Sequence, residues 1–123
     1  MTNNANVPSK ASMIMLGVEN VERSVKFYRD TLALPLQNQS SEFAFFSAGG
    51  ITLGLNLPLG KAVQPRPGAT EIVFPVESVV AAHGLLVDRG CTFLTQPREV
   101  FSGTWGATFT DPDGHRLTLL GPQ

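Results

Sequence analysis

Apolar residues recur along this chain with two spacings that alternate from one segment to the next. The run at 13–18 is apolar, and it is followed by Asn20, whose side chain is suited to cap a helix. After Asn20, the apolar positions 21, 25, 28 and 32 fall on one helical face. Pro35 ends that pattern, and short extended segments are expected at 36–39, 43–47 and 51–56. The first half of the chain therefore predicts a strand, a helix and three further strands.

The same order returns in the second half. A strand is expected at 71–76, Ser78 is the next capping residue, and a helical face follows that ends at Gly90. Extended segments are expected at 91–95, 105–110 and 116–120. The turn at 111–114 is expected to hold one hairpin together, a structural role alone. Asn20 and Ser78 are 58 positions apart, and the last strands of the two halves are 64 positions apart. The two copies therefore differ only in the length of a loop within the unit. The pattern predicts two βαβββ units.

Proline and glycine separate the two units. Residues 57–68 contain three prolines and two glycines, which predicts a linker rather than an element. We expect one domain at 11–120, with module one at 11–56, the linker at 57–68 and module two at 69–120, after a disordered or extended tail at 1–10. Each unit would cover one face of a sheet with its helix and leave the other face open. The predicted fold is α+β, with two tandem βαβββ modules forming a cupped mixed sheet around a cavity, the default ligand site.

Charge limits the classes of partner. The 123 residues include nine Lys and Arg and ten Asp and Glu, a net charge of −1, so no nucleic-acid partner is expected. No apolar run approaches the ~20 residues that span a bilayer, and the first residues lack the apolar centre of a signal peptide. We therefore expect no membrane partner and a cytoplasmic location. Charged residues make up only 15% of the chain, which favours a surface covered by a second copy, in a homodimer, or turned toward a cavity.

Three groups of residues carry a family resemblance. They are the segment LGVENVERSVKFY at 16–28, the pair Trp105-Gly106, and the segment FTDPDGHRL at 109–117. In this order and spacing, they resemble the vicinal oxygen chelate superfamily, which includes glyoxalases, bleomycin-resistance proteins, fosfomycin-modifying enzymes and extradiol dioxygenases. The resemblance covers nearly the whole of 11–120. It implies paired βαβββ modules around a cavity, and commonly a homodimer whose two cavities draw on both chains.

The resemblance also implies where a divalent metal would be held, by inward side chains on the first and fourth strands of each module. At those positions this sequence has Met13, Gly54, Glu71 and Thr118. A thioether suits a soft ion, glycine has no side chain, a hydroxyl is a weak donor, and a lone carboxylate does not make a site. His83 is expected at the edge of a helix and His115 in a turn with a local hydrogen bond, where neither completes the set. We therefore expect no cofactor and no divalent metal.

Glu71 is the candidate catalytic residue. Strand alternation would place Val73 and Pro75 beside it on the cavity face and Ile72, Phe74 and Val76 on the helix side. In such an apolar setting the pKa of Glu71 would rise, and it would act as a general base or as a hydrogen-bonding anchor. The competing interpretation is a solvated strand end. The candidate ligand-binding residues are Met13, Met15, Gly54, Glu71, Trp105 and Thr118.

Aromatic and sulfur side chains leave further alternatives open. Trp105 is either a flat wall for a planar ligand or a filler of the barrel mouth. Phe43 and Phe45 share one strand face and Phe46 takes the other, so at least one of the three is in the core. Cys91, the single cysteine, is expected to be a buried, inert thiol.

These residues favour a metal-independent protein that binds a small organic molecule in a mostly apolar cavity, for sequestration or resistance. One alternative is a lyase, isomerase or dioxygenase-like enzyme, closest to a glyoxalase-like lyase, that uses Glu71 as base or has a metal site in another register. Another is an interaction domain whose cavity is filled by its own Met and Phe side chains.

Overall fold

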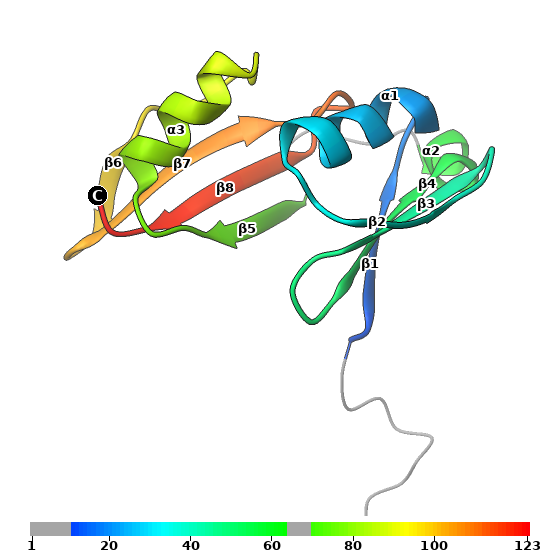
Figure 1. Cartoon of the computed structure of the whole chain (residues 1–123), viewed down its shortest axis with the longest axis horizontal. Coiled ribbons are helices and arrows are strands. Elements are labelled where there is room, and N and C mark those ends of the chain that lie inside the picture. The colour runs from blue at the N-terminus through cyan, green and yellow to red at the C-terminus, as the bar shows by residue number, and fades with distance from the viewer. Residues whose placement is uncertain (1–10, 64–69) are drawn as a thin grey trace, which may run out of the picture.

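The chain folds into two βαβββ modules, as a computed structural model that describes residues 11–63 and 70–123 shows. The first module contains β1 (Met13–Gly17), α1 (Val21–Lys26), a π-helical turn η1 (Phe27–Thr31), β2 (Leu36–Gln39), β3 (Phe43–Ser47) and β4 (Thr52–Asn56). The second contains β5 (Glu71–Pro75), α3 (Val79–Asp88), β6 (Arg98–Phe101), β7 (Thr104–Thr110) and β8 (Arg116–Gly121). The modules lie side by side (Figure 1). The predicted tail at 1–10 and the linker residues 64–69 lie outside the described residues.

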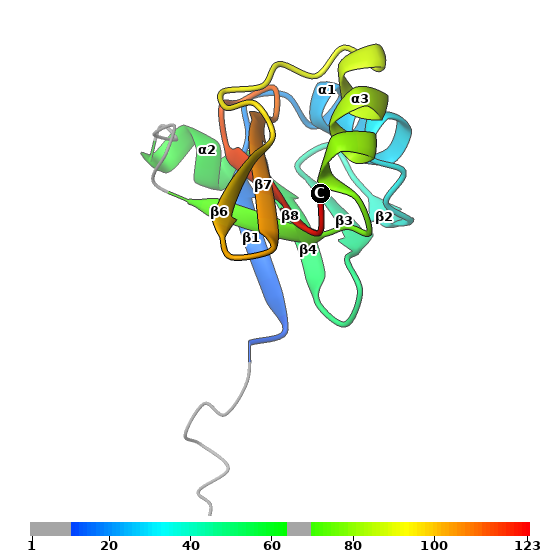
Figure 2. The same cartoon turned by 90° about the vertical axis from the view of Figure 1, so that its left-hand side faces the viewer.

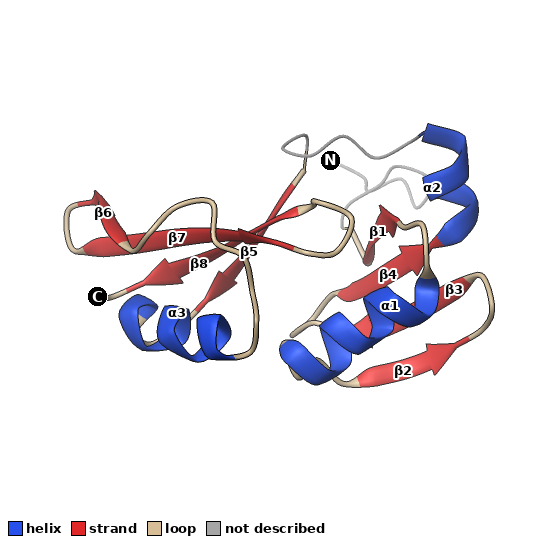
Figure 3. Cartoon of the chain, turned by 90° about the horizontal axis from the view of Figure 1, so that it is seen from above, coloured by secondary structure: helices blue, strands red, loops and turns tan. Residues whose placement is uncertain are grey.

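Each module has its own four-stranded sheet. The strand orders are β1-β4-β3-β2 and β5-β8-β7-β6. In each sheet the first strand pairs in parallel with the last, and the remaining pairs are antiparallel. Figure 3 shows α1 over the first sheet and α3 over the second. The predicted fold class, α+β with two tandem βαβββ modules, is confirmed.

Side-chain caps set the start of both main helices. The Asn20 side chain accepts a hydrogen bond from the Arg23 amide at 2.9 Å, and Ser78 Oγ accepts one from the Ala81 amide at 3.1 Å. These bonds satisfy amides that have no partner within the helix. Both predicted caps are confirmed.

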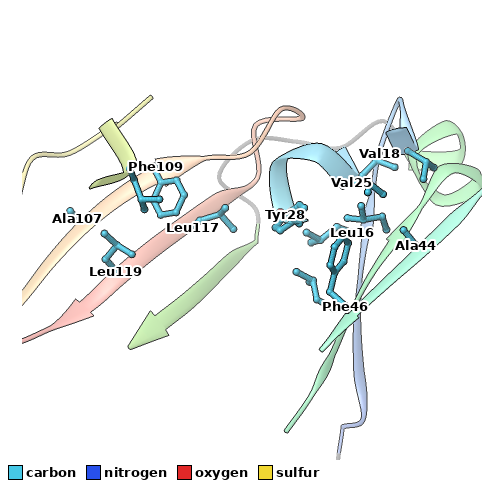
Figure 4. Packing of buried hydrophobic residues seen from close by; sticks show 14 of the residues in the cluster. Leu16, Val18, Val25, Tyr28, Ala44, Phe46, Ala107, Phe109, Leu117 and Leu119 are labelled. Atoms are coloured by element: carbon cyan, nitrogen blue, oxygen red, sulfur yellow. The ribbon is translucent and has the colours of Figure 1, made fainter. Parts of the chain in front are cut away.

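The core lies between each helix and its sheet. Leu16 and Phe46 lie below α1, and Phe109, Leu117 and Leu119 lie near α3 (Figure 4). Strand side chains alternate between the two faces of a sheet, and these buried residues lie on the face toward the helix. The other face of each sheet has no main helix over it.

The segment after β4 is a helix, which corrects part of the linker prediction. It is α2 (Leu57–Val63), and Asn56 Oδ1 accepts a hydrogen bond from the Leu59 amide at 2.8 Å. Pro58 is tolerated because the first turn of a helix needs no intrahelical amide donor. Gly60 packs against the Val18 backbone so closely that a Cβ atom would overlap its carbonyl. Figure 2 shows α2 on the far side of the molecule from α1 and α3.

The strand predicted at 91–95 is wrong, because the sixth strand begins later, at Arg98. Phe93 forms only an isolated bridge with Phe109. Its ring packs 5.0 Å from the Phe109 ring and 4.4 Å from His83, between centroids. The apolar residues in this segment therefore serve packing instead of continuous strand pairing.

The turn between β7 and β8 joins the two modules and reaches α1 (Figure 1). Tyr28 Oη donates to Asp111 Oδ2 at 2.8 Å, and the Asp113 carboxylate accepts from Arg23 and Ser24 at 3.0 and 3.2 Å. This turn was predicted to have a structural role alone. Its contacts confirm such a role and extend it from one hairpin to the junction of the modules.

Candidate ligand-binding site

Three candidate residues lie together on the sheet face opposite α1, which we call the open face of module one. Met13 pairs with Thr52 and Met15 with Gly54 across the parallel strands β1 and β4. A Cβ atom at Gly54 would overlap the Met15 sulfur and contact the Phe45 ring at 3.3 Å. The space that glycine leaves is thus already taken by Met15 and Phe45, and this part of the face is an apolar surface.

Phe43 and Phe45 complete that open face. Phe46 is fully buried in the core, whereas Phe43 and Phe45 are partly exposed. The Phe43 and Phe45 rings are stacked, with centroids 6.2 Å apart and an interplanar angle of 7°. The sequence predicted that these two share a face, but it did not assign them to the ligand site. The pairing of Phe45 with Gly54 in the sheet is what places these rings beside the candidate residues.

Glu71 and Thr118 lie on the sheet face opposite α3, the open face of module two. Glu71 pairs with Arg116, and Val73 pairs with Thr118. Glu71, Val73 and Pro75 are exposed, whereas the alternate residues Ile72, Phe74 and Val76 pack on the core, as predicted.

Polar partners surround both candidate residues of module two. The Glu71 side chain is 44% exposed, and its Oε2 lies 3.5 Å from Arg116 Nε. Within one chain its setting is therefore an exposed ion pair and not an apolar pocket. Thr118 Oγ1 lies 2.8 Å from Thr108 Oγ1, and this hydroxyl pair is buried. Sequence reasoning missed Arg116 and Thr108, which the alternation of β7 and β8 places on this face.

Trp105 does not join the other candidates. It shares the strand face of Ala107 and Phe109, and it packs, half-buried, against the core. Thr118 and its strand partner Thr108 lie on the opposite face of the sheet from Trp105. The place of Trp105 on the core face agrees with the second of its two predicted alternatives, a packing residue.

The two open faces do not enclose a common space within one chain. The sheets share no strand pairing. The labelled core residues Leu16 and Phe46 project from the first sheet toward module two (Figure 4), so the open face of module one is turned away from it. Met13 and Gly54 are thus separated from Glu71 and Thr118.

The cysteine and the histidines lie away from the open faces. Burial raises the pKa of the Cys91 thiol, and Arg89 opposes this only in part, so Cys91 is a poor nucleophile. His83 packs on Phe93 from α3, as the prediction of a helix edge requires. The His115 imidazole was predicted to bond within its own turn, which is wrong: its buried Nε2 lies 2.8 Å from the Gly17 carbonyl oxygen, in the other module.

The donor set on the open faces does not fit a divalent metal. Across the described ranges, no group of three or more His, Cys, Asp or Glu side chains lies close enough to hold an ion. Of the four positions expected from the family, Glu71 is paired with Arg116 and Thr118 with Thr108. The other two are a thioether and a glycine.

Comparison with known proteins identifies the class. The chain matches the model of the Glyoxalase/Bleomycin resistance protein/Dioxygenase superfamily over residues 10–119, and it belongs to that superfamily. Metallothiol transferase FosB of Shouchella clausii is 30% identical over 106 residues, 83% of this chain and 73% of that protein. FosB of Staphylococcus saprophyticus is 27% identical over 112 residues, 86% of this chain and 72% of that protein.

Solved structures share the fold. A glyoxalase-related enzyme from Fulvimarina pelagi has a TM-score of 0.81 at 24% identity, covering 93% of this chain and 88% of its own. TnmS3, an antibiotic binding protein from Streptomyces sp. CB03234, has a TM-score of 0.77 at 20% identity, covering 94% and 98%. No helix among the described residues is long and apolar enough to cross a membrane.

These relatives correct the cofactor prediction. We expected no cofactor and no metal, whereas the curated relatives are named metallothiol transferases. A metal therefore belongs to the chemistry of proteins that this chain resembles. The prediction rested only on the donors at four positions of this chain, and the names of its relatives overturn it.

Proposed function

We propose that this chain forms a homodimer that binds a small organic molecule between the open face of module one in one copy and the open face of module two in the other. The observation that carries the proposal is the exposure of apolar side chains on both open faces, 42% for Met13 and 47% for Val73. Large apolar side chains that lie together in water mark a surface for a ligand or a partner. A second copy would cover both faces at once and supply the half of the pocket that a single chain lacks.

Two observations support binding as the role. TnmS3, which has the same fold, is named an antibiotic binding protein, and this supports sequestration or resistance. The open faces offer apolar walls from Met13 and Met15 and orienting polar groups from Glu71 and Thr118, the usual composition of a small-molecule site.

An enzyme of the same superfamily is the second candidate. The names of the FosB relatives and of the Fulvimarina pelagi protein support it. In this reading Glu71 is the base, within reach of a ligand held against Thr118. The ion pair of Glu71 with Arg116 favours the binding role, because it fixes the carboxylate as a polar anchor.

A thermal-shift screen of antibiotics and other small organic compounds tests the proposal. We expect individual compounds to raise the Tm in a saturable way, as ligands that bind only the folded state do. Mass spectrometry of the recovered compound then separates the two roles, since a binding protein returns it unchanged. The proposal is wrong if no compound raises the Tm, and the enzyme is favoured if the compound is altered by the unmodified chain but not by Glu71→Gln.

A further inference from the structure

The open face of module one is an aromatic platform. Its Phe43 and Phe45 rings are stacked, with nearly parallel planes at an interplanar angle of 7°. The Met15 side chain lies over Gly54, in a space that it shares with the Phe45 ring. The hydrophobic core does not include Phe43, Phe45 or Met15. The strands β1, β3 and β4 contain no charged residue, and the polar side chains that share this face are the neutral Ser47, Thr52 and Asn56. These strands therefore give the platform apolar contact and ring faces without a charge.

The open face of module two has a different chemistry. Arg116 is 34% exposed, and its contact with Glu71 is a single one, from Nε, at 3.5 Å. A guanidinium has five N–H donors in one plane, so most of its donors face away from that contact. Their fork matches the two oxygens of a carboxylate or a similar anion.

We propose that the ligand is a planar aromatic compound that carries an anionic group. Its ring lies on Phe43 and Phe45 of one copy, and its anion binds Arg116 of the other. This inference rests on the proposed function, since it requires the two open faces to meet across the homodimer. It assigns Phe43, Phe45 and Arg116 to the site as the residues that determine specificity.

Each part of the ligand follows from one face. A flat ring lies parallel to the two phenyl groups and extends their stack, whereas a puckered ring touches them only at a few atoms. An anion is favoured over a cation because Glu71, the carboxylate on the open face, already has Arg116 as its partner. A ligand anion joins this pair and uses donors of Arg116 that the carboxylate does not engage.

Three matched probes separate the two requirements. They are 2-naphthoate, its neutral analogue 2-naphthamide, and the saturated decahydro-2-naphthoate, each titrated into the dimer by isothermal calorimetry. We expect 2-naphthoate to bind about tenfold more tightly than the amide, from a charge-assisted hydrogen bond. We expect it to bind about fivefold more tightly than the saturated acid, from stacking. Equal affinities for the three probes, or no binding of 2-naphthoate, would overturn the proposal.

Two variants assign each preference to its residue. Phe45→Leu keeps apolar bulk and is expected to lose the preference for the aromatic over the saturated acid. Arg116→Gln is expected to lose the preference for the acid over the amide. Two matched controls are expected to keep both preferences. Phe101→Leu changes an aromatic residue that is 70% exposed in the tip of the β6–β7 hairpin. Arg29→Gln changes an arginine that forms an exposed ion pair with Asp30. Because the readout is a ratio of affinities, a general loss of stability does not imitate it, and preferences that survive both variants overturn the assignment.

Mixing the two variants separates this inference from the proposed function. In a dimer with one Phe45→Leu copy and one Arg116→Gln copy, one site has both substitutions and the other has neither. We expect tight 2-naphthoate sites to reappear on mixing, in about a quarter of the total for random pairing of copies. If each variant loses its own preference but mixing restores nothing, the site lies within one chain and the proposed dimer site is wrong. If the chain is a dimer that binds other compounds but not 2-naphthoate, the ligand class alone is wrong.

Discussion

His115 connects the modules through one buried hydrogen bond. Its side chain is at the start of β8, and its Nε2 lies 2.8 Å from the carbonyl oxygen of Gly17 at the end of β1. A carbonyl only accepts, so the imidazole carries its proton on Nε2. By contrast, the buried Nε2 of His83 has no hydrogen-bond partner among the residues described.

We predict that His115→Ala lowers the free energy of unfolding by about 2 kcal/mol, because a buried carbonyl loses its donor. The measurement is urea denaturation. His83→Phe is the matched control: it keeps the ring packing on Phe93 and removes an unpaired polar atom, so its free energy of unfolding should equal or exceed that of the unmodified chain. Equal losses in both variants would contradict this prediction.

Asp111 titrates in an unusual setting for a carboxylate. Burial raises the pKa of its carboxyl above the ordinary 3.8, although the charge of His115 and then the hydrogen bonds from Tyr28 and from the amides of His115 and Asp113 oppose this. Burial first, and then Asp111, raise the pKa of the Tyr28 phenol well above its usual value, so Tyr28 stays protonated and donates. The folded chain therefore holds the Asp111 proton to higher pH than the unfolded chain does.

This difference fixes the sign of a pH effect. A raised pKa in the folded state gives stability that is full below about pH 3.8 and is lost as the pH rises through the raised value. We predict that the stability of the unmodified chain relative to Asp111→Asn falls as the pH increases across this window, in urea denaturation at a series of pH values. Asp30 provides a control of opposite sign: the Arg29 side chain lowers its pKa, so its contribution is lost as the pH falls. A relative stability that rises with pH for Asp111 would refute the assignment.

At the scale of elements, α2 depends on a close approach of two backbones. Gly60 lies in this helix, and a Cβ atom there would overlap the Val18 carbonyl. An alanine inside a helix is ordinarily better than glycine by about 1 kcal/mol. We predict the reverse here: Gly60→Ala lowers the free energy of unfolding by about 2 kcal/mol, as overpacking does.

Gly54→Ala is the comparison for that measurement. Its new Cβ would meet the Met15 sulfur, the far part of a flexible side chain, and not a backbone carbonyl. We therefore expect a loss below about 1 kcal/mol in the same urea experiment. If Gly54→Ala were the more damaging of the two, the docking of α2 on Val18 would not be the limiting contact.

The elements also show what the sequence determines. The strands at 36–39 and 43–47 were predicted from alternation with the bounds that β2 and β3 have, and both helix caps followed from Asn20 and Ser78. The sequence did not predict α2, because Pro58 and Gly60 are typical of loops and the Val18 contact that favours glycine is tertiary. It also misplaced the sixth strand, because the apolar residues around Phe93 serve packing instead of pairing.

For the molecule as a whole, the sequence determines faces but not which faces meet. Strand alternation correctly placed Glu71 opposite Ile72 and Phe74, and it put Met13 and Gly54 on one face. The direction in which each open face points depends instead on the junction through Asp111, Asp113 and His115, whose reach across modules has no local signal. In the proposed dimer, the four candidate positions converge only through the assembly, so an experiment on oligomeric state tests this convergence.

Substitutions at Val73 and Val80 test the oligomeric state, because the two side chains are equally exposed, at 47%, but lie on different surfaces. Val73 lies on the open face of module two, and Val80 lies in the first turn of α3. In the proposed dimer, Val73→Glu places a charge in a covered apolar face, and we predict that the dimer dissociates and that the Tm loses its dependence on protein concentration. Val80→Glu adds the same charge near a helix N-terminus, where it is tolerated, and should leave the dimer intact. Size-exclusion chromatography with light scattering reads both results, and a Val73→Glu chain that stays dimeric would mean that the copies meet through another surface.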